Sequence, residues 1–158
     1  MNRKKIITYI IWIIAVEAVG LLSGLLSMSG MAVYNETAIK PALTPPDIVF
    51  PIVWTVLYAL MGISAARIWM AGPSQAQSTG LNLFITQLIF NFFWSLLFFN
   101  AQAYGFAAIW LGVLWVLTLL MIFAFYRVDK LAAYLQIPYL LWLTFAAYLN
   151  VTVWILNR

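Results

Sequence analysis

Aromatic side chains at helical spacing are the residues of this chain whose types could bind a ligand or support chemistry. Trp54 and Tyr58 are four residues apart, and Tyr139, Trp142 and Ala146 follow one another at spacings of three and four. Residues at these spacings lie on one face of a helix. Two such faces could enclose an aromatic pocket that holds a flat ligand by ring stacking. Packing at a membrane interface or against lipid is the simpler interpretation of each residue taken alone.

Polar residues within the apolar stretches allow two interpretations. Gln87, Asn91 and Ser95 are spaced by four residues and therefore share one helix face, which could line a cavity or hydrogen-bond to neighbouring helices. Asn150 allows the same alternatives. Glu17 could contact a proton or a cation, or it could be a protonated carboxyl that is hydrogen-bonded to another helix.

Several kinds of chemistry are excluded because the chain contains no Cys and no His. Disulfides, thiol nucleophiles and imidazole bases cannot form, and the commonest protein ligands to zinc and to haem iron are missing. We therefore expect no metal site and no required cofactor. The net charge of +4 rests on only eight basic residues, so we expect no binding to nucleic acid.

Five apolar stretches must position these residues. The chain is 66% hydrophobic and 8% charged, whereas a water-soluble domain has about 25% charged residues. A helix needs about 20 apolar residues to cross a membrane, and its backbone groups then pair within the segment. We therefore predict an all-α membrane protein, a single domain covering residues 1–158. The predicted helices cover residues 6–26, 48–70, 81–99, 104–126 and 131–156.

The connections between these stretches predict how the helices are arranged. Residues 100–103 form a very tight turn, so the third and fourth helices should be antiparallel neighbours. Residues 27–47 form the longest connection, which we expect to act as a lid over a cavity, and the alternative is a flexible linker. Pro138 should kink the fifth helix.

Basic residues near the membrane ends predict the orientation. They favour a cytoplasmic N terminus, with the C terminus and the long connection outside, in a plasma membrane of bacterial type. Six lie on the N-terminal side (Arg3, Lys4, Lys5, Arg67, Arg127 and Lys130), and two lie on the other side (Lys40 and Arg158).

Three segments carry a resemblance to a known family. The first runs from Tyr34 through Lys40-Pro41-Ala42-Leu43-Thr44-Pro45-Pro46 to Trp54 and Leu57-Tyr58-Ala59-Leu60-Met61-Gly62. The second is Asn91-Phe92-Phe93-Trp94-Ser95 with Phe98-Phe99. The third is Ile137-Pro138-Tyr139-Leu140-Leu141-Trp142, which continues to Phe145-Ala146 and Leu149-Asn150. With these segments the chain resembles the translocator protein family, also called tryptophan-rich sensory proteins (TspO/MBR) or peripheral-type benzodiazepine receptors.

The resemblance implies a five-helix bundle, usually a homodimer in membrane lipid, with a cavity that the first loop caps. It implies binding of tetrapyrroles such as protoporphyrin IX and of synthetic isoquinoline carboxamides. It also implies that Trp54 and Trp142 match the tryptophans linked to light-dependent degradation of protoporphyrin in some bacterial members. Other residues match pocket-lining positions of the family: Tyr34, Pro45, Tyr58, Asn91, Ser95 and Ala146.

The chain departs from the family pattern at two places. Leu43 stands where the family often has Trp, which weakens any aromatic contact from the lid. The stretch that matches the animal cholesterol motif, residues 149–154, contains no Tyr, so we predict no specific cholesterol recognition.

Three functions are therefore considered. The first is a binding and sensing protein for tetrapyrroles, in which Trp54, Tyr58 and Trp142 stack on the macrocycle and Lys40 pairs with a propionate. The second is an enzyme that degrades protoporphyrin in light through Trp54 and Trp142. The third is a transporter, although the sequence shows neither an inverted repeat nor paired broken helices.

Overall fold

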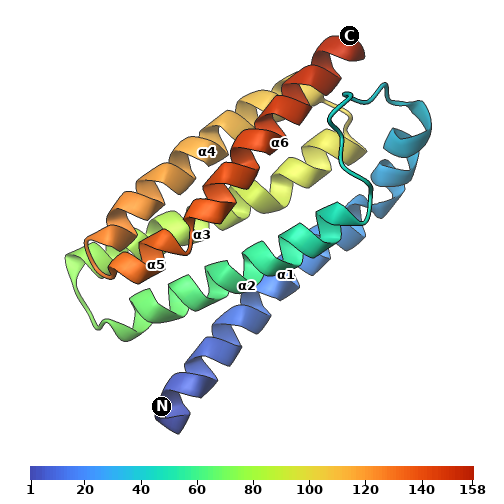
Figure 1. The fold of residues 1–158 in the computed structure, drawn as a ribbon. Helices are drawn as coiled ribbons and strands as arrows, with labels where there is room; N and C mark the ends of the chain where they lie inside the picture. Colours follow the sequence, from blue (N-terminus) through green and yellow to red (C-terminus); the bar gives the residue numbers. More distant parts are fainter.

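The computed structural model describes all residues from Met1 to Arg158, and all of its regular elements are helices, as Figure 1 shows. Its five longest helical stretches are apolar enough to cross a membrane, which confirms the predicted fold class. One stretch continues from α3 into the π-helical turn η1, and another is divided into α5 and α6. The elements are α1 (Arg3–Thr37), α2 (Val49–Met70), α3 (Gln75–Ser95), η1 (Leu96–Asn100), α4 (Tyr104–Tyr126), α5 (Lys130–Tyr134) and α6 (Ile137–Leu156).

The helices form one elongated bundle (Figure 1). Helix α1 packs on α2, α3 packs on α4, and α4 packs on α6, so α3 and α4 are the antiparallel neighbours that the tight turn predicts. The N terminus lies at one end of the bundle, and the C terminus lies at the other end beside the segment that joins α1 to α2. This segment, residues 38–48, is called the connector.

The distribution of polar and apolar side chains suits lipid rather than water. Large apolar side chains such as Leu141 and Ile109 are 65% and 69% exposed, respectively, while Gln87 and Asn150 are buried. Lipid tails can cover the apolar exterior, and polar groups in the interior can pair with one another.

The predicted boundary of the first helix was wrong, because α1 continues past residue 26 to Thr37. Residues 27–37 lack the hydropathy of a membrane span, but they remain helical because Tyr34 packs against η1. Its ring centroid lies 5.3 Å from the rings of both Phe98 and Phe99. The connector is therefore residues 38–48 rather than 27–47, and Tyr34 belongs to α1.

Two other helices differ from prediction by more than one residue, while the fourth helix begins and ends as predicted. Helix α3 begins at Gln75 instead of residue 81 because the Ser74 hydroxyl caps it, accepting from the backbone N–H of Gln77 at 3.1 Å. The fifth predicted helix is interrupted between α5 and α6, and Pro138 lies in the first turn of α6, where its missing N–H costs little. The predicted kink is thus a full break.

At the end of the bundle opposite the connector, Arg67 and Asp129 form an ion pair with a separation of 2.7 Å. Burial alone would raise the pKa of Asp129. Hydrogen bonds from Arg67 and from the backbone N–H groups of Ala132 and Leu131 outweigh burial, so the net pKa is lowered.

This ion pair predicts an acid-dependent loss of stability. A lowered pKa in the folded state stabilises the protein at neutral pH, and this contribution disappears as the pH falls below 3.8, the ordinary value. Thermal unfolding in detergent should show Asp129→Asn to be less stable than the wild-type protein at pH 7. The difference should shrink steadily as the pH falls below 3.8, whereas a difference that does not change with pH would contradict the assignment.

Candidate functional site

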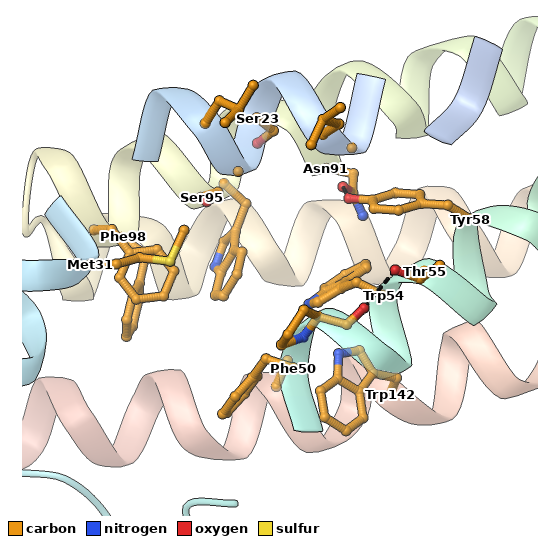
Figure 2. A pocket seen from close by; sticks show the side chains of 18 of the residues that line it. Ser23, Met31, Phe50, Trp54, Thr55, Tyr58, Asn91, Ser95, Phe98 and Trp142 are labelled. Carbon is orange, nitrogen blue, oxygen red and sulfur yellow. Dashed lines mark hydrogen bonds between the residues drawn. The ribbon is translucent and has the colours of Figure 1, made fainter. Parts of the chain in front are cut away.

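A cavity of about 880 Å³ lies beneath the connector, and Figure 2 shows many of its side chains. Small-molecule sites typically measure about 300–1,000 Å³, so the cavity is large enough for a drug-sized ligand. Its residues come from α1, α2, α3, η1, α6 and the connector. Aromatic rings form two groups in its lining.

The Trp54 cluster consists of Phe50, Trp54, Tyr58 and Trp142 on α2 and α6 (Figure 2). Trp54 stacks on Tyr58 with 5.3 Å between ring centroids, because the two residues are one helical turn apart. Trp54 and Trp142 meet edge to face at 6.5 Å, and Phe50 lies 5.9 Å from Trp142. The indole rings of the second and last spans therefore meet at one cavity.

The Phe98 cluster consists of Tyr34, Trp94, Phe98 and Phe99, on α1, α3 and η1. Trp94 stacks on Phe98 at 5.2 Å. The π turn, in which the Ala101 N–H donates to the Leu96 carbonyl five residues earlier, changes the helical register here. The ring contacts lie within each cluster, and none joins the Phe98 cluster to the Trp54 cluster.

A chain of buried hydrogen bonds lies behind the Trp54 cluster. The Tyr58 hydroxyl donates to Asn91 Oδ1 at 2.7 Å, and Asn91 Nδ2 donates to the Tyr139 oxygen at 2.8 Å. The Tyr139 hydroxyl in turn donates to Gln87 Oε1 at 2.8 Å. Gln87, Asn91 and Ser95 were expected either to line a cavity or to hydrogen-bond to neighbouring helices. Asn91 does both, because it lines the cavity and its hydrogen bonds join three helices.

Two more polar lining residues are held by neighbouring helices. Ser95 shares a hydrogen bond of 2.8 Å with Ser27 on α1. Asn150 Oδ1 accepts from the Trp94 indole N–H at 3.0 Å, and its Nδ2 donates to the Tyr104 carbonyl at 2.8 Å. These contacts fix the aromatic ring of Trp94 at the cavity.

The connector contributes Lys40, Thr44 and Asp47 to the mouth of the cavity. Lys40 Nζ donates to Asn35 Oδ1 at 2.8 Å and lies 5.3 Å from the centre of the Tyr34 ring. The ammonium group is therefore present at the mouth, and its contact with a propionate stays a prediction.

The structure brings most of the predicted site residues to the cavity, and their role in binding stays a prediction. Pro45 is not among the lining residues, although its neighbour Thr44 is. Tyr139 is 1% exposed and lies behind the cavity, where its hydroxyl is used by Asn91 and Gln87. The predicted residues that do line the cavity are Tyr34, Lys40, Trp54, Tyr58, Asn91, Ser95, Trp142 and Ala146.

Sequence reasoning missed a large part of the lining. Of the Phe98 cluster, Tyr34 was predicted and Trp94, Phe98 and Phe99 were missed. The spacing of four would have placed Trp94 and Phe98 on one face, but their meeting with Tyr34 depends on how α1 packs against η1. Phe50 was missed, although its spacing of four from Trp54 would have placed it on the same face. Helix α1 supplies a further row of lining residues: Ile13, Ile14, Glu17, Ala18, Gly20, Leu21, Ser23, Gly24, Leu25 and Met31.

The connector is held against α6 by the side chain of Asn157. Asn157 Oδ1 accepts from the Ile39 N–H at 2.8 Å, and its Nδ2 donates to the Ile39 carbonyl at 2.9 Å. Asn157 Nδ2 also donates to the Val153 carbonyl at 2.7 Å, which orients the amide. These are the hydrogen bonds that join the connector to α6.

Replacing Asn157 with Leu should loosen the connector. The side chain keeps a similar size but loses both hydrogen bonds to Ile39, each contributing about 1 kcal/mol. Hydrogen–deuterium exchange of residues 38–44 should be about tenfold faster than in the wild-type protein, and exchange in α4 should be unchanged. Arg158→Gln is the neighbouring control. If the connector exchanged at the same rate in Asn157→Leu as in the wild-type protein, contacts other than those of Asn157 would hold the connector.

Five helices that are long and apolar enough to cross a membrane, with an aromatic cavity beneath one connecting segment, define an integral, multi-pass membrane protein. The chain belongs to the TspO/MBR family, whose model matches residues 12–155. It is 37% identical over 156 residues to Tryptophan-rich protein TspO of Chlorobaculum tepidum, with 98% of this chain and 99% of the relative covered.

Relatives from other lineages show the same similarity. The chain is 38% identical over 117 residues to Translocator protein of Sus scrofa, covering 73% of this chain and 69% of the relative. It is 37% identical over 119 residues to Tryptophan-rich sensory protein of Cereibacter sphaeroides, covering 75% of this chain and 73% of the relative. The predicted family is therefore confirmed.

Proposed function

We propose that the protein is a membrane-embedded binding and sensing protein for tetrapyrroles such as protoporphyrin IX, and for related apolar ligands such as isoquinoline carboxamides. The single observation that carries this proposal is the meeting of Trp54 and Trp142, with 6.5 Å between ring centroids, in a cavity whose lining also contains the Phe98 cluster. A porphyrin is a flat π-system, and each aromatic contact contributes about 0.5–1.5 kcal/mol beyond burial.

The mouth of the cavity supports one orientation of the macrocycle. Lys40 could pair with a propionate while the apolar edge enters between the aromatic clusters. An exposed ion pair contributes only about 0–1 kcal/mol, so Lys40 would orient the ligand more than it would hold it. By the family resemblance, the unit that binds would be a homodimer in membrane lipid, in a bacterial plasma membrane with the connector outside.

Titration of the purified protein with protoporphyrin IX tests the proposal, with porphyrin absorbance as the readout. We expect saturable binding that an isoquinoline carboxamide displaces. Because the chain offers neither His nor Cys to iron, metal-free porphyrin should bind at least as tightly as haem. Binding that never saturates, or haem that binds far more tightly, would contradict the proposal.

A second candidate function is light-dependent degradation of protoporphyrin, which the continuous contact of oxidisable rings favours. Trp54 touches Trp142, Tyr58 and Tyr139 through ring contacts of 6.5, 5.3 and 6.2 Å, respectively. Illuminated porphyrin passes energy to dioxygen, and indole rings nearby can donate electrons or form adducts. The double variant Trp54→Phe/Trp142→Phe should form no product but bind porphyrin nearly as well. Trp69→Phe, which alters an exposed indole outside the cavity, is the control.

A further inference from the structure

Glu17 is a carboxylate in the middle of a membrane-spanning helix, and it lines the cavity. Ionisable residues in spans are costly and normally face a partner. Glu17 makes no hydrogen bond or ion pair with the rest of the chain. The ion pair of the chain joins Arg67 and Asp129 instead. The carboxylate is therefore directed at the cavity without a protein group to neutralise it.

Gly20 and Tyr58 place Glu17 at the inner part of the cavity. Gly20 is one helical turn from Glu17, and a Cβ at Gly20 would overlap the Tyr58 ring, so α1 and the Tyr58 side chain approach closely. Tyr58 is one turn farther from the connector than Trp54. Glu17 therefore lies beyond the Trp54 and Trp142 rings as seen from the mouth.

Several oxygen atoms at this inner part can still accept a hydrogen bond. The Tyr58 proton is given to Asn91 Oδ1, so Tyr58 has no donor left for a ligand, while Asn91 gives one of its two amide N–H groups to Tyr139. The Ser23 hydroxyl donates to the Phe92 carbonyl at 2.8 Å. The oxygens of Glu17, Tyr58 and Ser23 remain free to accept.

The donors lie nearer the mouth. The indole N–H groups of Trp54 and Trp142 have no acceptor within the protein, in contrast to that of Trp94, which donates to Asn150. Lys40, the one basic residue in the lining, is at the mouth and already donates to Asn35. The lining thus holds two acidic side chains, Asp47 at the mouth with Lys40 and Glu17 at the inner part without a basic residue.

We propose that the inner part of the cavity is a subsite for a protonated amine on a flat aromatic ligand, with Glu17 as its counter-ion. The amine would donate to the Glu17 carboxylate and to the Tyr58 oxygen, while the aromatic body contacts the Trp54 cluster. A bound cation favours the ionised carboxyl over the protonated one. This subsite rests on the proposed function because both use the same cavity. It extends the class of ligands from anionic tetrapyrroles to cationic aromatic molecules.

Two acridine probes test the subsite, with probe fluorescence anisotropy in detergent as the readout. At pH 7.5, 9-aminoacridine is protonated, whereas acridine is neutral and of similar shape. The wild-type protein should bind the cation about tenfold more tightly, since a hydrogen bond between charged groups is stronger than one between neutral groups. Glu17→Gln should reduce this preference to about one. Glu36→Gln, the same change at an exposed position of α1 outside the cavity, should retain it.

Equal affinities for the two probes in the wild-type protein would overturn the subsite, as would an undiminished preference in Glu17→Gln. Protoporphyrin IX titrated into the same samples separates this failure from failure of the proposed function. Intact porphyrin binding without an amine preference removes only the subsite. Absence of both porphyrin binding and the amine preference would show that the cavity is not a binding site, which contradicts the subsite and the proposed function together.

Discussion

Replacing Ala146 with Phe should weaken protoporphyrin IX binding about 100-fold. Ala146 is 7% exposed, lines the cavity, and lies one helical turn from Trp142. A phenyl ring at this position would occupy the space that the macrocycle needs, and forcing both into one site costs about 1–3 kcal/mol, or roughly 5- to 150-fold in affinity. Titration followed by porphyrin absorbance measures the change without relying on tryptophan fluorescence.

Leu141→Phe is the matched control for this substitution. Leu141 is on the same helix and 65% exposed to the lipid side, so the added ring should leave affinity unchanged. Thermal unfolding of both variants shows whether the bundle is intact. An Ala146→Phe protein that is folded and binds porphyrin normally would place the ligand elsewhere.

Replacing Tyr139 with Phe should lower the free energy of unfolding by about 2 kcal/mol, because its hydroxyl makes two buried hydrogen bonds of about 1 kcal/mol each. Loss of this hydroxyl leaves Asn91 Nδ2 and Gln87 Oε1 without their partners. The effect on porphyrin affinity should be less than about threefold, since Tyr139 lies behind the cavity rather than in its lining. Equilibrium unfolding in mixed micelles and porphyrin titration measure the two quantities.

Tyr134→Phe provides the comparison, because Tyr134 is 52% exposed and loses no buried hydrogen bond. It should have the stability of the wild-type protein. If Tyr139→Phe retained full stability but lost porphyrin binding, Tyr139 would contact the ligand, as its spacing with Trp142 first suggested.

Hydropathy was sufficient to predict the five spans, because lipid demands long apolar segments whose backbone groups pair internally. The same criterion misplaced the end of α1. Residues 27–37 are less apolar than a span, but a helix can continue beyond the membrane when its side chains have a partner, as Tyr34 has in Phe98 and Phe99. That partner comes from η1, which is distant in sequence, so no local pattern could have shown it.

The candidate site was predicted where a single helix face carries it. Trp54 with Tyr58, and Trp142 with Ala146, are each one turn apart, so their joint position follows from helix geometry. Tyr139 shares a similar spacing but faces Asn91 and Gln87 of α3, and periodicity alone does not say which neighbour a face meets. The amide of Asn157, which holds Ile39 of the connector, depends likewise on how α6 and the connector lie in space.

A structure of the protein with protoporphyrin IX bound, determined in lipid nanodiscs, tests the central claim most directly. We predict that density for the macrocycle lies in the cavity beneath residues 38–48, in contact with the rings of Trp54 and Trp142 and with a propionate directed at Lys40. Density at the lipid-facing surface, or an empty cavity at saturating porphyrin, would contradict this account.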